Sequence, residues 1–66
     1  MTQRELLALL HGGRPVNATT LVEWGMELSA AARLLHRAWL DQPVTIHRRR
    51  PAGAAEYEYS TPKGER

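Results

Sequence analysis

Residues 17–39 read NATTLVEWGMELSAAARLLHRAW, and this stretch decides the fold. It predicts two helices, one on each side of Gly25. Asn17 is a good N-cap for the first of them, and Val16 and Leu21 have the spacing of a hydrophobic staple around it. The first helix is therefore short, and it ends at Gly25 because glycine readily adopts the left-handed backbone of a helix C-terminus.

The second helix of this stretch is predicted over residues 30–40, with Ser29 as its N-cap. It is rich in Ala, Leu and Arg, which are strong helix formers. Its apolar side is formed by Leu28, Ala31, Ala32, Leu35, Ala38 and Trp39. Its polar side is formed by Ser29, Arg33, His36 and Arg37. This helix therefore has a compact basic face with no acidic residue in it.

Another helix is predicted over residues 3–11, before this stretch. Thr2 and Glu5 have the spacing of a capping box, in which each side chain accepts a hydrogen bond from a backbone amide of the first turn. Leu6, Leu9 and Leu10 recur at helical spacing and form its apolar face, which Leu7 flanks. The glycines at positions 12 and 13 end the helix. Leu7 belongs either to the margin of the core or to a surface for self-association.

A β-hairpin is predicted at the C-terminal side, with strands over residues 44–50 and 55–60 in which polar and apolar residues alternate. Residues 51–54 (PAGA) are predicted to form a type II turn between them. The register that follows pairs Ile46 with Tyr59, Arg48 with Tyr57, His47 with Glu58, and Arg49 with Glu56. Opposite charges then face each other across the hairpin, a contribution of ~0.2–1 kcal/mol per pair. Whether the arginines of the first strand are neutralised in this way stays open.

The composition bounds the function. The chain has 66 residues and a net charge of +2, but residues 28–50 carry five Arg, two His and a single acid, Asp41. There is no Cys, and the three His match no metal-ligand spacing, so no disulfide, metal site or cofactor is expected. Ser29 and Ser60 have no base at a recognisable spacing, so an enzyme is not expected either. No apolar run approaches the ~20 residues of a membrane span, and we expect a cytoplasmic protein.

The predicted order of helix, short helix, turn, basic helix and hairpin resembles a winged helix-turn-helix domain. Within residues 17–39, Gly25 is in the place of the turn glycine, Met26 fills the apolar position after it, and Ala31 matches a buried position of the second helix. The segments VTIHRRR, PAGA and EYEYS resemble the wing, and STPKG is similar to the segment after the wing in MarR-like proteins. The fold class expected is mainly α with a β-hairpin wing, as one domain over residues 1–60 with a flexible tail over 61–66.

The resemblance implies a small bacterial or phage transcription regulator that binds double-stranded DNA, with the second helix of the motif in the major groove and the hairpin as the wing. The residues that would face DNA are Ser29, Ala30, Arg33, His36 and Arg37 from the helix, and His47, Arg48, Arg49 and Arg50 from the wing. Arginine suits this role because its planar fork matches guanine or a phosphate bidentately. The N-terminus of the helix, capped by Ser29, would offer free amides to a phosphate.

A module this small makes few contacts with DNA, so a homodimer through residues 3–11, Trp24 or the hairpin edge is expected to supply specificity. A second interpretation stays open. The same fold serves as a protein-interaction module, such as a host-takeover inhibitor or an assembly subunit. Exposed Leu7 and Trp24, the acidic strand of the hairpin and the modest net charge favour it.

Overall fold

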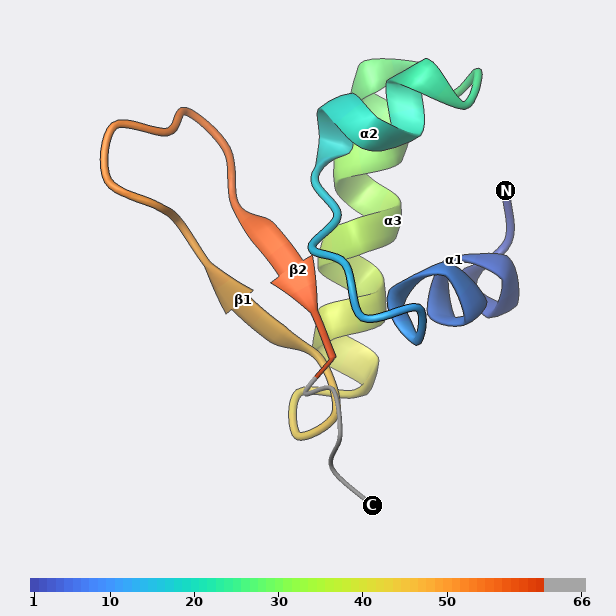
Figure 1. Ribbon diagram of the computed structural model, residues 1–66. Helices are drawn as coiled ribbons and strands as arrows, with labels where there is room; N and C mark the ends of the chain where they lie inside the picture. The colour runs from blue at the N-terminus through green and yellow to red at the C-terminus, as the bar shows by residue number, and fades with distance from the viewer. Residues whose placement is uncertain (62–66) are drawn as a thin grey trace.

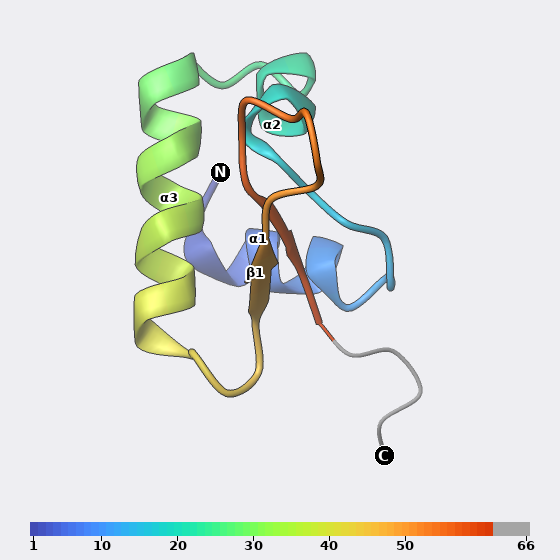
Figure 2. The ribbon, with the colours of Figure 1, turned by 90° about the vertical axis from the view of Figure 1, so that its left-hand side faces the viewer.

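A computed structural model describes residues 1–61 as three helices followed by a two-stranded antiparallel sheet (Figure 1). The elements are α1 (Gln3–Leu10), α2 (Ala18–Glu23), α3 (Leu28–Asp41), β1 (His47–Arg49) and β2 (Glu58–Ser60). Helix α3 is the long element, and α1 and the hairpin lie on opposite sides of the molecule (Figures 1 and 2). The predicted mainly helical fold with an antiparallel hairpin is confirmed.

One hydrophobic core joins the three helices to the sheet. Its buried members are Leu6, Leu10, Val16, Ala18, Leu21, Ala31, Leu35, Ala38, Ile46 and Tyr59. Each predicted element contributes at least one of them. A chain of this size buries only about 60% of its unfolded surface, so this single cluster carries most of the apolar stabilisation.

The predicted caps of the first two helices are confirmed. The backbone N of Glu5 donates to Thr2 Oγ1 at 3.2 Å, and the backbone N of Thr2 donates to Glu5 Oε1 at 2.8 Å. The backbone N of Thr20 donates to Asn17 Oδ1 at 2.9 Å. Both residues of the staple, Val16 and Leu21, are buried. Helix α1 ends at Leu10, one residue before the predicted end.

Gly25 makes the turn between α2 and α3, as predicted. Its φ of 104° lies in the left-handed region that favours glycine. Its N donates to the carbonyl of Val22, and the N of Met26 donates to the carbonyl of Leu21. These two bonds form a Schellman motif, which satisfies carbonyls at the end of a six-residue helix.

Helix α3 begins earlier than predicted. It starts at Leu28, and its N-cap is Glu27, so the prediction of Ser29 as the cap is wrong. The predicted apolar side is also too wide. Leu28 is 58% exposed, because it lies in the first turn of the helix, beyond the core. Trp39, at the other end of that side, is half-buried and packs against the edge of the core.

The register of the hairpin differs from the prediction by two residues. The paired residues are His47 with Ser60, Arg48 with Tyr59, and Arg49 with Glu58. A shift of two keeps the side chains of the paired residues on their predicted faces, because the period of a strand is two. The predicted charge pairs of His47 with Glu58 and of Arg49 with Glu56 are therefore wrong.

The bend before β2 gives the reason for this shift. The predicted turn is present, since the N of Ala54 donates to the carbonyl of Pro51 and Gly53 has a φ of 81°. The chain then bends at Ala55 and Glu56 instead of entering the strand, and the carboxylate of Glu56 accepts hydrogen bonds from the backbone N and the hydroxyl of Thr19. Glu56 therefore caps α2 and does not pair with the other strand.

Val16 forms an isolated antiparallel bridge to the sheet, which the sequence did not indicate. Its N and carbonyl exchange two hydrogen bonds of 2.8 Å with Tyr59, on the side of β2 opposite β1. Thr61, in the tail predicted to be flexible, is buried and donates its hydroxyl to the carbonyl of Leu10 at 3.0 Å. The remainder of that predicted tail, 62–66, lies outside the described residues.

Candidate nucleic-acid interface

The exposed side of α3 carries three of the predicted DNA-facing residues. Arg33, His36 and Arg37 are all exposed, because Ala31, Leu35 and Ala38 turn the opposite side of the helix into the core. Going around the helix, His36 lies nearest to Trp39, Arg33 comes next, and Arg37 is furthest from it. The other two predicted helix residues lie in the first turn, where Ser29 is exposed and Ala30 is half-buried.

The N-terminus of α3 is not open to a phosphate. The carboxylate of Glu27 accepts hydrogen bonds from the backbone N atoms of Ser29, at 3.4 Å, and Ala30, at 3.3 Å. The hydroxyl of Ser29 lies 2.8 Å from both carboxylate oxygens. The Ser29 hydroxyl, the two backbone amides and, more weakly, the charge of Arg33 hold the pKa of Glu27 below its usual range. The expected phosphate site at these amides is therefore occupied by the protein's own carboxylate.

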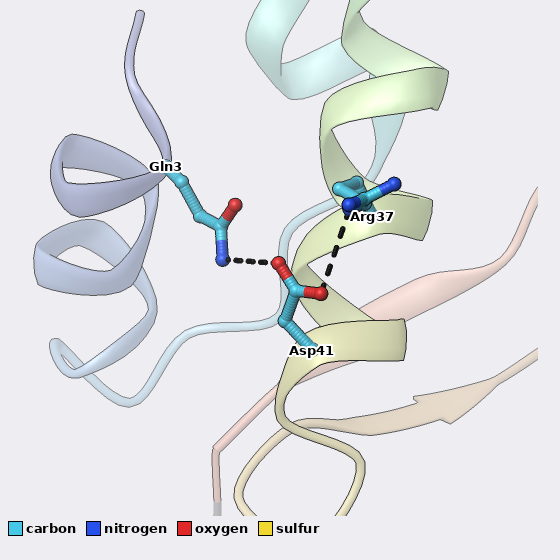
Figure 3. A network of polar contacts seen from close by, with 3 residues as sticks. All are labelled: Gln3, Arg37 and Asp41. Atoms are coloured by element: carbon cyan, nitrogen blue, oxygen red, sulfur yellow. Dashed lines mark hydrogen bonds and ion pairs between the residues drawn. The ribbon is translucent and has the colours of Figure 1, made fainter.

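A second carboxylate lies at the other end of α3. Asp41 is in the last turn, and its Oδ1 is 3.5 Å from Nε of Arg37, four residues before it. Its Oδ2 accepts a hydrogen bond of 3.1 Å from Nε2 of Gln3 in α1 (Figure 3). The pair is exposed, with 73% of the Arg37 side chain accessible. The expectation of a basic face without acids thus holds for the middle of the helix but not for its ends.

The basic residues of the hairpin divide between its two faces. His47 and Arg49 are exposed and point to the face away from the helices, whereas Arg48 lies on the same face as the buried Ile46 and is half-buried. Arg50 follows β1 and is exposed. Three of the four residues predicted to act from the wing are thus accessible to a ligand.

Arg48 lies between two aromatic rings. Its Cζ is 3.8 Å from the centroid of the Trp39 ring and 4.2 Å from that of Tyr57. Arg50 lies on Tyr57 as well, with its Cζ 5.6 Å from the centroid, and the His36 ring is 5.9 Å from that of Trp39. These distances permit cation–π attraction. Alternation along the strands predicted that Arg48 and Tyr57 share a face, but nothing in the sequence indicated that Trp39 completes the stack.

Within the part of the chain that the structure describes, the acidic residues of the hairpin form no ion pair with its arginines. Glu56 is engaged with Thr19, and Glu58, although opposite Arg49 in the ladder, forms no ion pair with it. Across residues 1–61, the ion pair of Arg37 with Asp41 is the only one present.

A separate apolar groove lies between α1 and the end of α2. It has a volume of about 540 Å³ and is lined by Met1, Glu5, Ala8, Leu9 and Trp24. Trp24 is 65% exposed there. Leu7 is not among the residues that line it. It is half-buried and packs against the core, so it belongs to the margin of the core, and the expectation that it is exposed is wrong.

No three His, Asp or Glu side chains gather as metal ligands within the described part of the chain. None of its helices is long and apolar enough to cross a bilayer. Comparison of the chain with protein-family models, with curated proteins and with solved structures finds no match.

Proposed function

We propose that this chain is a winged helix-turn-helix domain that binds double-stranded DNA and acts as a small bacterial or phage transcription regulator. Helix α3 enters the major groove, and the hairpin acts as the wing on the neighbouring backbone. Three helices followed by an antiparallel hairpin are compatible with this fold.

The observation that carries the proposal is a row of contacts that joins the exposed side of α3 to the hairpin. His36 contacts Trp39, Trp39 contacts Arg48, and Arg48 leads through Tyr57 to Arg50. Arg33 and Arg37 are exposed further around α3. Exposed arginines on the helix and on the hairpin that it contacts suit the phosphates of a duplex.

The carboxylates at the two ends of α3 refine how the duplex would lie. Glu27 repels phosphates from the first turn, so the attraction comes from the exposed arginines further along α3 and from the hairpin. We place five side chains closest to DNA, because they are exposed and none of them is in an ion pair within residues 1–61: Arg33, His36, His47, Arg49 and Arg50.

The test is DNA binding by a double variant, Arg33→Ala with Arg37→Ala, measured by fluorescence anisotropy with a labelled duplex of mixed sequence. The matched control is Arg4→Ala with Arg14→Ala, which removes the same charge from exposed positions on α1 and the α1–α2 connector. The proposal predicts salt-sensitive binding by the parent, a clear loss in the α3 variant and a smaller loss in the control. Equal binding by the two double variants would refute the assignment of α3.

The second candidate function is a protein-interaction module, and the groove that contains Trp24 favours it. Tryptophan at 65% exposure beside an apolar groove is typical of a protein contact. The same groove, which α1 and Trp24 form together, is where we place the contact of a homodimer on DNA. Absence of DNA binding even at low salt, together with a stable protein complex that Trp24→Ala abolishes, would favour this second function.

A further inference from the structure

Arg48 differs from the arginines beside it in the strand. Arg49 and Arg50 are exposed, whereas the guanidinium of Arg48 is half-buried between the rings of Trp39 and Tyr57. Trp39 belongs to α3, and Tyr57 lies just before β2. The side chain of Arg48 therefore touches both parts of the candidate interface at once.

We infer that Arg48 is a positioning residue, which holds the hairpin at a set angle to α3, and that it does not itself contact DNA. This inference rests on the proposed function. It replaces the expectation from the sequence that Arg48 faces DNA with the other arginines of the wing.

The hairpin needs such a contact because its own ladder is short. Only three residue pairs join β1 to β2, and a two-stranded hairpin is marginally stable in water without packing on another element. Ile46 and Tyr59 anchor its base in the core. Residues 50–57, which form its far end, lie outside the ladder. Glu56 ties this end to α2 through Thr19, and Tyr57 is linked to α3 through Arg48 and Trp39.

The stack suits arginine better than lysine. A guanidinium is planar and weakly hydrated and stacks on aromatic faces, whereas the ammonium group of lysine is compact and strongly hydrated. The Cζ of Arg48 is 3.8 Å from one ring centroid and 4.2 Å from the other, so the guanidinium is engaged with the protein itself. Its removal disturbs the position of Arg49 and Arg50 rather than deleting a contact with phosphate.

Four variants separate the two roles: Arg48→Lys, Arg48→Gln, Arg49→Lys and Arg49→Gln. Their affinity for the labelled duplex is measured at several salt concentrations. The plot of log K against log salt has a negative slope. Removing the charge of a residue that contacts a phosphate reduces the magnitude of this slope by about 0.9, whereas substitution by lysine retains the contact and the slope. We expect this behaviour at position 49. At position 48 we expect both substitutions to weaken binding about two- to fivefold, with no change of slope, because each weakens the cation–π contacts that hold the hairpin against α3.

A readout without DNA follows the stack directly. In a Trp24→Phe background, the fluorescence of Trp39 becomes more accessible to acrylamide when Arg48 is replaced by Lys or Gln, and stays unchanged in the two Arg49 variants. Thermal unfolding by circular dichroism verifies that each variant is folded. If Arg48→Gln does not fold, the more conservative Arg48→Lys still tests the inference.

Two results would overturn the inference. One is binding by Arg48→Lys equal to that of the parent, which would show that the stacked guanidinium is not needed. The other is a decrease of about 0.9 in the magnitude of the salt slope in Arg48→Gln, which would assign Arg48 to a phosphate. Failure of the parent to bind the duplex at low salt is a different outcome. It refutes the proposed function, and the inference falls with it.

Discussion

Asp41 is expected to limit the affinity of the protein for DNA, and Asp41→Asn tests this. In the parent, Asp41 holds the Nε of Arg37 at 3.5 Å and places a negative charge at the end of the candidate interface. The asparagine keeps an oxygen for the hydrogen bond from Gln3 but carries no charge. Arg37 is then released to contact a phosphate.

The size of the effect follows from the number of contacts. One additional phosphate contact raises the affinity at most about 15-fold at ~50 mM salt and about fivefold at ~150 mM, because each contact contributes about 0.9 to the salt slope. The stability of the fold changes little. An ion pair as exposed as this one contributes ~0–1 kcal/mol, and a carboxylate in the last turn of a helix opposes the helix dipole.

The assay is a salt titration of DNA binding by the parent, by Asp41→Asn and by Glu23→Gln. Glu23→Gln is the control, because it removes the same charge from the last turn of α2, where the described structure has no ion pair. We expect the slope to steepen by about 0.9 in Asp41→Asn alone. An identical gain in both variants, with no change of slope, would show that only net charge matters and would refute the role given to Arg37.

Three further predictions concern stability. Ile46→Ala, in the core, is expected to lower the free energy of unfolding by about 2–5 kcal/mol. Val44→Ala, at a position 88% exposed, is expected to change it by less than about 0.5 kcal/mol. Equal effects of the two substitutions in urea unfolding would contradict this packing. Gly25→Ala is expected to cost about 1 kcal/mol or more, because φ there is 104°, and an unchanged melting temperature would rule this out. The pKa of Glu27 is lowered in the fold, so its contribution to stability is present above its ordinary pKa of 4.5 and is lost as the pH falls through the lower folded value. On acidification the parent should therefore lose more stability than Glu27→Gln. Parallel curves of unfolding free energy against pH for the two proteins would be evidence against the cap.

Much of the fold was predictable because local signals agreed with one another. The capping box at Thr2, the N-cap at Asn17 and the glycine turn at Gly25 each act over a few residues, and all three are present. Helical spacing found the buried side of α3 as well. Alternation placed the residues of β1 and β2 on their correct faces even though the register was wrong, since a shift of two residues preserves the faces.

The errors arise where contacts join segments that are distant in the sequence. The register depends on Glu56, which turns away to cap α2, 37 residues earlier in the chain. The stack depends on Trp39 of α3 meeting Arg48 of β1, and Asp41 becomes part of the candidate interface through Arg37 and Gln3. Local propensity predicted Ser29 as the cap of α3, but the longer side chain of Glu27 reaches the free amides, and Ser29 becomes the second residue of the helix.

The most direct test of the central claim is a titration of the isotope-labelled protein with a mixed-sequence duplex at low salt, followed by two-dimensional amide NMR. We expect the largest shift changes in the middle and C-terminal half of α3 and at residues 47–50. Shift changes confined to α1 and Trp24, or none at all, would contradict DNA binding through α3 and the hairpin.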